Sequence, residues 1–446
     1  MKRYENTIGV QVPSVLLPKE GVDLYKWAVV ACDQYTAQTE YWEETGRIVG
    51  EAPSALKLIL PEAYLNKPGE TERIARVKRT MQSYLDEGLL ENLPQGFILV
   101  RRRVSKKERL GLMLALDLER YDFQKGAKTL IRATEGTVVE RIPPRLRIRE
   151  GAPIELPHIL VLIDDPGRTV IEPLYAAGQP RVLYDTDLMQ RGGRVTGYLV
   201  DDTARIEAVI AALEALADKD AFAARYGAGQ APLLFAMGDG NHSFATAKTV
   251  WENIKKTLPH TALNDHPARY ALVEIENVHD DGIEFEPIHR ILLRVRPEET
   301  LRAITARMQA ENGGATLTYC QNSDLCSAAA ESAKGDMSSA HILPFYTGER
   351  CGFIRVDRPA RQLAVGTLQS AIDAVVQAPG EVDYIHGEFV MKNLAGQPGA
   401  IGFLLPSMQK SALFKTVVYD GALPRKTFSM GEANEKRYYM ECRRII

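Results

Sequence analysis

Apolar and polar positions along the chain follow two different periods, which predicts a protein built from both helices and strands. Between Thr71 and Leu90 the apolar residues fall at helical spacing, and Gly88 lies near the end, so this segment is predicted to be a helix. The runs "GFILVRRRV" and "GLMLALDLE" then have the pattern of two strands joined by the polar turn "SKKERL". Residues 1–125 are therefore predicted to form an N-terminal α+β region.

The same mixture of periods continues through residues 126–292, which are predicted to form a central domain. Two short apolar runs, "HILVLID" and "TVIEPL", precede a helical pattern from Asp201 to Tyr226. The run "APLLFAM" is typical of a buried strand that ends at Gly238, and helical spacing returns from Phe244. The segments "RYALVEIENV" and "EFEPIHRILL" are predicted to be paired strands.

Residues 293–446 are predicted to form a C-terminal α+β region that contributes to the functional site. It opens with the helical pattern "PEETLRAITARMQAENG", and "HILPFYT" and "CGFIRVD" are typical of a hairpin across Gly348. A short amphipathic helix, "TLQSAIDAVVQAP", and a strand, "AIGFLLP", precede a polar tail with a strand-like end. The fold class predicted for the whole chain is α+β, with helices and strands mixed.

Composition narrows the class of protein. A chain of 446 residues exceeds one ordinary core, so two or three domains are expected. The net charge of −3 gives no sign of a nucleic-acid partner. No apolar run is long enough for a membrane span, and the N-terminus lacks the apolar core of a signal peptide, so a cytoplasmic protein without a membrane partner is expected. The oligomeric state stays open, a homodimer included.

The cysteines predict reduced thiols and no structural metal. The chain has five cysteines and no CxxC motif, which is typical of a reducing compartment. No close pair of cysteine and histidine has the spacing of zinc ligands.

The densest chemistry lies in Gly238–Ser243, "GDGNHS", where a predicted strand gives way to a helix. Amides at a helix start lack intrahelical partners, and glycines permit a close approach, so this loop suits an anion such as phosphate. The alternative is an ordinary turn in which Asp239, Asn241 or Ser243 only caps the helix.

Other motifs fit the loop less well. The P-loop string GxxxxGK(S/T) does not occur, and the acids that a dinucleotide fold requires, Glu274 and Glu276, come too late after the near match to GxGxxG. The Asp-x-His and Gly-His-x-His strings that accompany Gly-Asn-His in two-metal phosphoesterases are missing. No G-x-S-x-G elbow surrounds Ser243, so the local string does not mark it as a nucleophile.

A second polar segment, Arg132 to Arg149, is dense in arginine and glutamate. Its Glu135 could deprotonate a hydroxyl if the fold brought it within reach of one. The arginines of "RLRIR" alternate, so a strand would present all of them on one side, where they could hold phosphates. The alternative is a solvated edge strand whose charges deter aggregation.

A chain-wide order of motifs supplies a resemblance. The strings "VACDQYTAQTEYW", "RATEGTVVERIPPR", "GDGNHSFATA", "EPIHRIL", "EVDYIHGE", "AIGFLLPS" and "LPRKTF" occur in this order. Their order resembles that of the bacterial and archaeal family known as domain of unknown function 1015, or DUF1015, over nearly the whole chain. That family has an Asp-Gly-His-His-Arg loop in the same strand-turn-helix setting, a His-Glu-x-Thr segment before it, and a Pro-Pro-Lys-Ser/Thr segment near its end.

The same motifs are similar to those of ADP-dependent free serine kinases, which share a ParB/sulfiredoxin-like core. This resemblance implies ADP or ATP with Mg²⁺ as ligands and a small-molecule substrate. It implies Glu135 as the base for the hydroxyl and Asp239 as the second catalytic residue. The residues implied to bind nucleotide or phosphate are Gly238, Gly240, Asn241, His242 and Ser243 of the loop, Arg425, Lys426 and Thr427 of the late segment, and Arg132 and Arg141 as substitute donors. Second-tier candidates in family-like strings are Asp33, His289, Arg290 and His386.

The loop departs from the family pattern at two positions, since Asn241 replaces the first histidine and Ser243 replaces the arginine. Three hypotheses follow. The first is a nucleotide-dependent, kinase-like phosphotransferase acting on a small hydroxyl-bearing metabolite, and the second is a regulatory protein that binds a nucleotide or phosphometabolite without catalysis. The third is a protein without a phosphate ligand, whose loop is only a capped turn. The sequence identifies neither the acceptor nor the phosphate donor.

Overall fold

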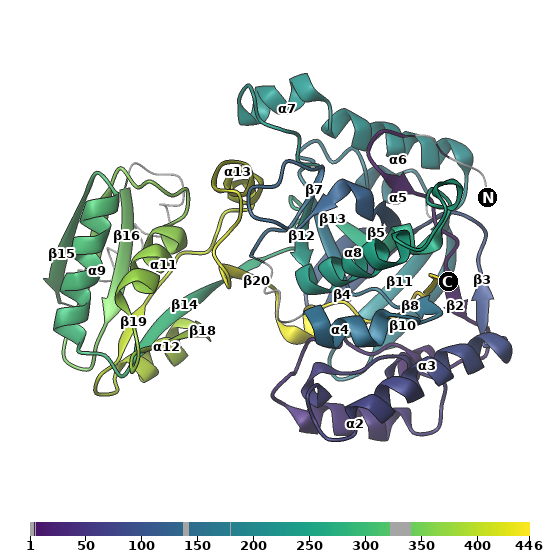
Figure 1. Cartoon of the computed structure of the whole chain (residues 1–446), viewed down its shortest axis with the longest axis horizontal. Helices are drawn as coiled ribbons and strands as arrows, with labels where there is room; N and C mark the ends of the chain where they lie inside the picture. Colours follow the sequence, from purple (N-terminus) through teal and green to yellow (C-terminus); the bar gives the residue numbers. More distant parts are fainter. Residues whose placement is uncertain (1–3, 5, 137–141, 179, 322–339) are drawn as a thin grey trace. The chain divides into compact units, whose positions relative to one another are not determined.

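The computed structural model describes residues 4, 6–136, 142–178, 180–321 and 340–446 (Figure 1). Its contacts form two compact units, unit 1 from Met1–Ile283 with Gly431–Ile446, and unit 2 from Glu284–Met430. The predicted α+β class is confirmed. The division differs from the predicted boundaries at 125 and 292, because strands from both sides of residue 125 pair in one sheet.

Unit 1 is built on a large mixed sheet, whose described strands have the order β10-β11-β4-β5-β13-β9-β12-β7-β6, with β1 beside β5. The strands are β1 (Val10–Gln11), β4 (Phe97–Val104), β5 (Lys107–Asp117), β6 (Tyr121–Asp122), β7 (Ile131–Arg132), β9 (Leu160–Ile163), β10 (Arg181–Leu188), β11 (Gly193–Val200), β12 (Phe235–Asp239) and β13 (Tyr270–Asn277). Two short pairs, β2 (Leu16–Pro18) with β3 (Leu90–Asn92) and β8 (Ile154–Glu155) with β21 (Arg443–Arg444), lie outside it.

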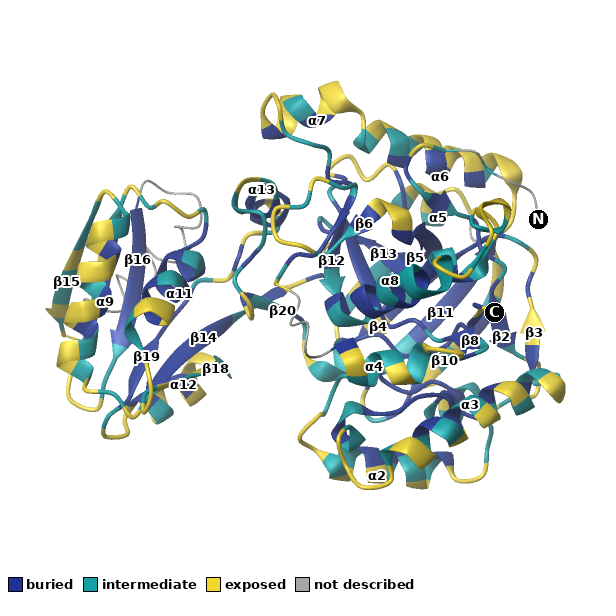
Figure 2. Ribbon diagram, viewed as in Figure 1, coloured by how far each residue is buried: buried dark blue, intermediate teal, exposed yellow. Residues whose placement is uncertain are grey.

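Both faces of the large sheet are covered, and the strand alternation divides its side chains between two cores. In β5, Leu112, Leu114 and Leu116 enter one core, while Met113 enters the other. The first core also takes residues of α5, α6 and α8, and the second takes residues of α1, α2 and α3 (Figure 2). Burial on both sides explains why "GLMLALDLE" is apolar almost throughout.

The helices of unit 1 are α1 (Leu24–Trp27), α2 (Thr39–Val49), α3 (Glu70–Asp86), α4 (Ile142–Arg149), α5 (Glu172–Ala176), α6 (Thr203–Leu216), α7 (Lys219–Tyr226) and α8 (Asn241–Lys255), with the 3-10 turns η1 (Ala55–Leu58) and η2 (Glu62–Tyr64). The segment "RLRIR" lies in α4, so the strand considered for it is wrong. Pro143 and Pro144 occupy the first turn, where proline suits a helix, and α4 packs against α8 and α3. Because α4 is a helix, its alternate arginines point to different sides and form ion pairs with different residues: Arg145 with Glu62, Arg147 with Glu70 and Arg149 with Glu155.

Unit 2 contains a second sheet, in which the described strands have the order β15-β17-β16-β19-β14-β18, with β20 beside β14. Its elements are β14 (Phe285–Leu293), α9 (Pro297–Glu311), β15 (Gly314–Cys320), β16 (Ala340–Tyr346), β17 (Cys351–Asp357), α11 (Ala364–Val375), β18 (Glu381–His386), α12 (Glu388–Ala395), β19 (Ile401–Phe403), α13 (Lys410–Asp420) and β20 (Phe428–Met430). The hairpin predicted across Gly348 is confirmed by β16 and β17. The predicted pairing of β13 with β14 is wrong, because each strand finds its partners in its own unit.

The tail that follows β20 returns to unit 1 and is fixed there by a buried arginine. The Arg437 guanidinium forms ion pairs with Glu274 and Glu441, and its Nε donates to the Pro157 carbonyl at 3.0 Å. All of these charged side chains are at most 4% exposed. Backbone bonds join the tail to the segment at Val29–Ala31, where Tyr439 N donates to Val29 O at 2.8 Å.

Arg437→Met is expected to lower the free energy of unfolding of unit 1 by about 3–5 kcal/mol, because it leaves buried carboxylates without their counter-charge. Trp27, Trp42 and Trp251 all lie in unit 1, so tryptophan fluorescence during urea unfolding reports on this unit. The matched control is Arg47→Met, whose ion pair with Glu44 is exposed (74% for the arginine) and contributes about 1 kcal/mol or less. Equal losses in the two variants would contradict the anchoring role of Arg437.

Candidate functional site

The predicted strand-turn-helix of "GDGNHS" is present as β12, a turn at Gly240 and α8. Gly240 has a φ of +80°, a left-handed conformation that favours glycine. A Cβ at this position would also lie 3.1 Å from Ile159 Cα, so the turn needs glycine for space as well as for conformation. The pairing of β12 with β9 has a bulge at Gly238. A bulge changes the direction of the side chain that follows it, which here is that of Asp239.

The segment that carries Glu135 runs beside this turn. Strands β7 and β12 are parallel, with Ile131 opposite Phe235 and Arg132 opposite Ala236. Just before Glu135, the Thr134 hydroxyl donates to the Met237 carbonyl at 2.6 Å, which keeps the two segments together beyond the strand pairing. Glu135 itself is half-buried.

Asp239 is paired with a cation from the tail. Lys436 Nζ lies 3.1 Å from Asp239 Oδ2, and the lysine side chain is only 9% exposed. The Gly240 amide donates to Asp239 Oδ1 at 2.8 Å. Burial opposes ionisation of this carboxyl, but Lys436 and the hydrogen bonds outweigh it, so the pKa of Asp239 lies below its ordinary value. The turn therefore holds a carboxylate with a lysine as its counter-charge.

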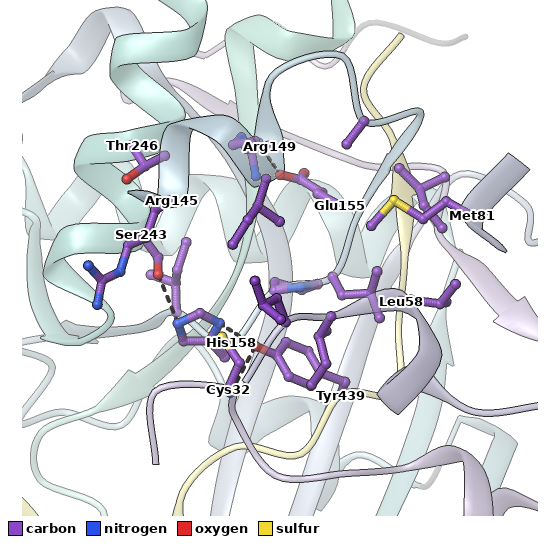
Figure 3. Close-up of a pocket in the computed structure, with 18 of the residues that line it drawn as sticks. Cys32, Leu58, Met81, Arg145, Arg149, Glu155, His158, Ser243, Thr246 and Tyr439 are labelled. Carbon is purple, nitrogen blue, oxygen red and sulfur yellow. Dashed lines mark hydrogen bonds and ion pairs between the residues drawn. The ribbon is translucent and has the colours of Figure 1, made fainter. Parts of the chain in front are cut away.

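A chain of hydrogen bonds leads from the first turn of α8 into unit 1 (Figure 3). Ser243 Oγ lies 2.9 Å from His158 Nε2, and Tyr439 Oη lies 2.8 Å from His158 Nδ1. The Tyr439 hydroxyl oxygen also accepts the Cys32 amide at 3.1 Å. Asp33 Oδ2 is 3.8 Å from His158 Nε2.

This chain of polar groups borders a cavity of about 120 Å³ within unit 1. Most of its wall is apolar, with Leu58, Met81, Ile154, Leu156 and Leu272 among the lining side chains. Glu62 and Arg145 form an ion pair in the same wall. Burial raises the pKa of Glu62 despite this arginine, and nearby Asp33 adds to the rise. A small molecule with an apolar body and a polar end fits such a surface.

The profile of the protein family "Protein of unknown function (DUF1015)" matches residues 16–375. The chain belongs to the DUF1015 family. Among curated proteins none matches it.

The solved structures similar to this DUF1015 protein are distant. A point mutant of a free serine kinase in complex with AMP is 11% identical, with a TM-score of 0.40, covering 76% of this chain and 93% of its own. A conserved hypothetical protein from Pyrococcus furiosus is 12% identical, with a TM-score of 0.36 and coverages of 76% and 97%. SbnI from Staphylococcus aureus, truncated at its C-terminus, is 8% identical, with a TM-score of 0.33 and coverages of 72% and 82%. At these scores the likeness assigns no activity.

The remaining loop residues of the DUF1015 chain differ in their surroundings. Asn241 is 6% exposed, and within the described chain its Oδ1 has no hydrogen-bond partner. A buried amide oxygen without a donor is costly, so this atom is suited to a ligand or a water. His242 is half-buried, and its carbonyl accepts the Thr246 hydroxyl at 2.7 Å.

Arg132 lies near the loop but uses its guanidinium on the backbone. It donates to the carbonyls of Thr129, Ala231 and Pro232 at 2.8–3.0 Å. Burial lowers its pKa to about 10. In this structure its role is therefore to hold neighbouring segments together. Arg141 lies outside the described residues.

The late segment belongs to unit 2, where Arg290 organises it. Arg290 is fully buried and donates to the carbonyls of Lys426 at 2.9 Å and Arg425 at 3.0 Å. Arg425 Nε donates to the Tyr384 hydroxyl at 3.0 Å, and the Thr427 hydroxyl donates to the Pro424 carbonyl at 2.6 Å. These contacts shape the segment within its own unit.

The two second-tier histidines also lie in unit 2. His289 is buried, its Nδ1 accepts the Leu405 amide at 3.1 Å, and burial lowers its pKa to about 4. It is therefore neutral and already hydrogen-bonded. His386 ends β18 and is exposed.

The sequence analysis did not single out three residues that complete the site, His158, Lys436 and Tyr439. His158 lies two residues before the apolar strand β9, and a polar residue so close to a buried strand is a weak signal of a site. Lys436 and Tyr439 lie in the polar tail, whose mixture of charges and aromatics does not indicate that both residues are buried.

Two findings apply only to the described residues of the DUF1015 chain. No group of three or more His, Cys, Asp or Glu side chains there is placed to hold a metal ion. None of its helices has both the length and the apolar character needed to cross a membrane.

The lowered pKa of Asp239 predicts a dependence of stability on pH. A carboxyl whose folded pKa lies below its unfolded value of about 3.9 stabilises the fold above that pH, and the benefit is lost as the pH falls through the folded pKa. The stability advantage of the wild type over Asp239→Asn, measured by urea unfolding, should be full above about pH 5 and shrink on further acidification. Asp201→Asn, at an exposed position, is the control and should show no such trend. An advantage of the wild type that grows in acid would contradict the ion pair with Lys436.

Proposed function

We propose that this protein is a nucleotide-dependent, kinase-like phosphotransferase that acts on a small hydroxyl-bearing metabolite. The observation that carries the proposal is the hydrogen bond from the Thr134 hydroxyl to the Met237 carbonyl at 2.6 Å, which joins the residue before Glu135 to the strand that ends at Asp239, just before α8. Two carboxylates at a glycine turn that opens a helix are the groups that phosphoryl transfer to a hydroxyl needs.

Each group of the turn has a task in such a reaction. The first amides of α8 and the ammonium of Lys436 offset the negative charge of phosphate oxygens. Glu135 would accept the proton of the acceptor hydroxyl as its oxygen forms the new bond to phosphorus. Positioning and charge neutralisation account for most of the catalysis in this class of reaction, so few further groups are required.

The residues present also fit a nucleotide with Mg²⁺. Enzymes of this type hold Mg²⁺ through one or two carboxylates and the substrate phosphates, rather than through a full protein cage. The Asp239 carboxylate and the unpartnered Asn241 Oδ1 are oxygen atoms suited to Mg²⁺ or its bound water. The ion would supply positive charge at the phosphate. The solved free serine kinases hold AMP or ADP, but the proposal rests on the loop and its charged neighbours, not on that distant likeness.

Glu135→Gln is expected to abolish phosphate transfer and to leave nucleotide binding nearly intact, because the amide cannot take the acceptor proton. Transfer is followed by phosphorus NMR with ADP or ATP, Mg²⁺ and a panel of hydroxylated amino acids, sugars and polyols. Binding is followed by the thermal shift, since a ligand at about a hundredfold its Kd adds about 2.7 kcal/mol to the stability of the native state. Glu207→Gln, on the exposed face of α6, is the matched control and should behave as the wild type.

The same experiment separates the regulatory alternative, which the substituted loop positions Asn241 and Ser243 favour. A protein that only senses a nucleotide or phosphometabolite would show the thermal shift without transfer in wild type and variant alike. No shift with either nucleotide at millimolar concentration would contradict the phosphotransferase and a nucleotide sensor alike.

A further inference from the structure

A hydroxyl and an imidazole face the cavity of unit 1, and the proposed phosphate transfer uses neither. Ser243 Oγ lies 2.9 Å from His158 Nε2, and both residues line the cavity (Figure 3). The pair is specific to the way this loop departs from the family pattern, because Ser243 stands where that pattern has arginine. A serine within hydrogen-bond reach of a histidine is the basic unit of a nucleophile with its base.

The surroundings of His158 favour the tautomer that such a base requires. The ring is 8% exposed and Tyr439 is 1% exposed, so both are held in place. The Tyr439 hydroxyl also interacts with the Cys32 side chain and can donate a hydrogen bond to its sulfur. The phenol oxygen can then accept from His158 Nδ1 at 2.8 Å, and Nε2 is left to accept the proton of Ser243. Tyr439 thus takes the orienting position at Nδ1.

The position of Ser243 in the fold supplies the remaining groups. It lies in the first turn of α8, after a strand and a left-handed glycine, so its hydroxyl stands beside amides that have no partner within the helix. Such amides can stabilise the oxyanion that develops when a carbonyl is attacked.

The cavity indicates the class of substrate. Its volume of about 120 Å³ corresponds to roughly ten water-sized positions, which is room for a short acyl chain. The apolar wall, with Leu58, Met81 and Leu156, suits hydrocarbon. Its charged side chains are paired with one another, Glu62 with Arg145 and Glu155 with Arg149, which favours a neutral substrate. A neutral ester with a short acyl group meets these requirements.

We propose that Ser243 is the nucleophile, and His158 its base, in the hydrolysis of small neutral esters. The Ser243 oxygen forms a bond to the acyl carbon while its proton passes to His158 Nε2. The bond between that carbon and the alcohol oxygen breaks, and the alcohol leaves with the proton from His158. Water then attacks the acyl carbon and gives a proton to His158. The bond between that carbon and the Ser243 oxygen breaks, His158 returns the proton to this oxygen, and the carboxylic acid is released. No nucleotide takes part, so this activity stands or falls separately from phosphate transfer.

The test uses the full chain with two probes, 4-nitrophenyl butyrate and a short-chain alkyl fluorophosphonate. The ester should be hydrolysed above the uncatalysed rate. The fluorophosphonate should lose fluoride and attach to Ser243, as mass spectrometry of the peptide that contains "GDGNHSFATAK" will show. Ser243→Ala should lose both reactions, and His158→Gln should slow both by about a hundredfold, the usual contribution of a general base.

Thr249→Val is the control for the loss of a hydroxyl from the same helix. The Thr249 hydroxyl donates to the Ala245 carbonyl of α8 at 2.9 Å and lies outside the cavity wall, so its loss should leave both rates unchanged. Labelling of the wild-type protein does not depend on the folding of any variant. A wild-type protein without the label on Ser243, or a folded His158→Gln that reacts as fast as the wild type, overturns the proposal.

Discussion

The site of unit 1 depends on one buried interaction, the position of Arg437 between Glu274, Glu441 and the carbonyl of Pro157. A buried ion pair of this kind is a costly way to gain stability, but it specifies position strictly. On one side of Arg437 it delivers Lys436 to Asp239, and two residues further on it delivers Tyr439 to His158. Since Pro157 directly precedes His158, the same guanidinium also fixes the approach of the histidine.

Two chemistries meet around the start of α8 and share only the amides of its first turn. On one side the turn holds the ion pair of Asp239 and Lys436, and the segment that leads to Glu135 is hydrogen-bonded to the same strand through Thr134. On the cavity side it presents Ser243 to His158 above an apolar wall.

The fold was predictable where its causes are local. An apolar run that ends in Gly-Asp-Gly specifies β12, the turn and α8 almost without outside help, and the hairpin of β16 and β17 follows equally from alternation and a turn. The strand considered for the arginines of α4 was wrong because an alternating pattern is also compatible with a helix. The packing of α4 on α8 decides in favour of the helix. The pairing of β13 and β14 failed because the division between the units falls between them. Tyr439 was beyond prediction, since it bonds with the Cys32 amide across 407 positions of sequence, and no local pattern records such a distance.

Because the tail, residues 431–446, belongs to unit 1, it affects the order in which the two units can fold during synthesis. Unit 2 is one continuous stretch, Glu284–Met430, so all of it is available before the tail is made. Unit 1 contains the earlier residues, yet the ion pairs of Lys436 and Arg437 and its second core are complete only once residues 431–446 have been made. Domains generally fold as units while the chain emerges from the ribosome. A ribosome that stalls before residue 436 would therefore release a chain without Lys436, Arg437 and Tyr439. A chain that lacks this tail keeps "GDGNHS" but cannot assemble the site around it.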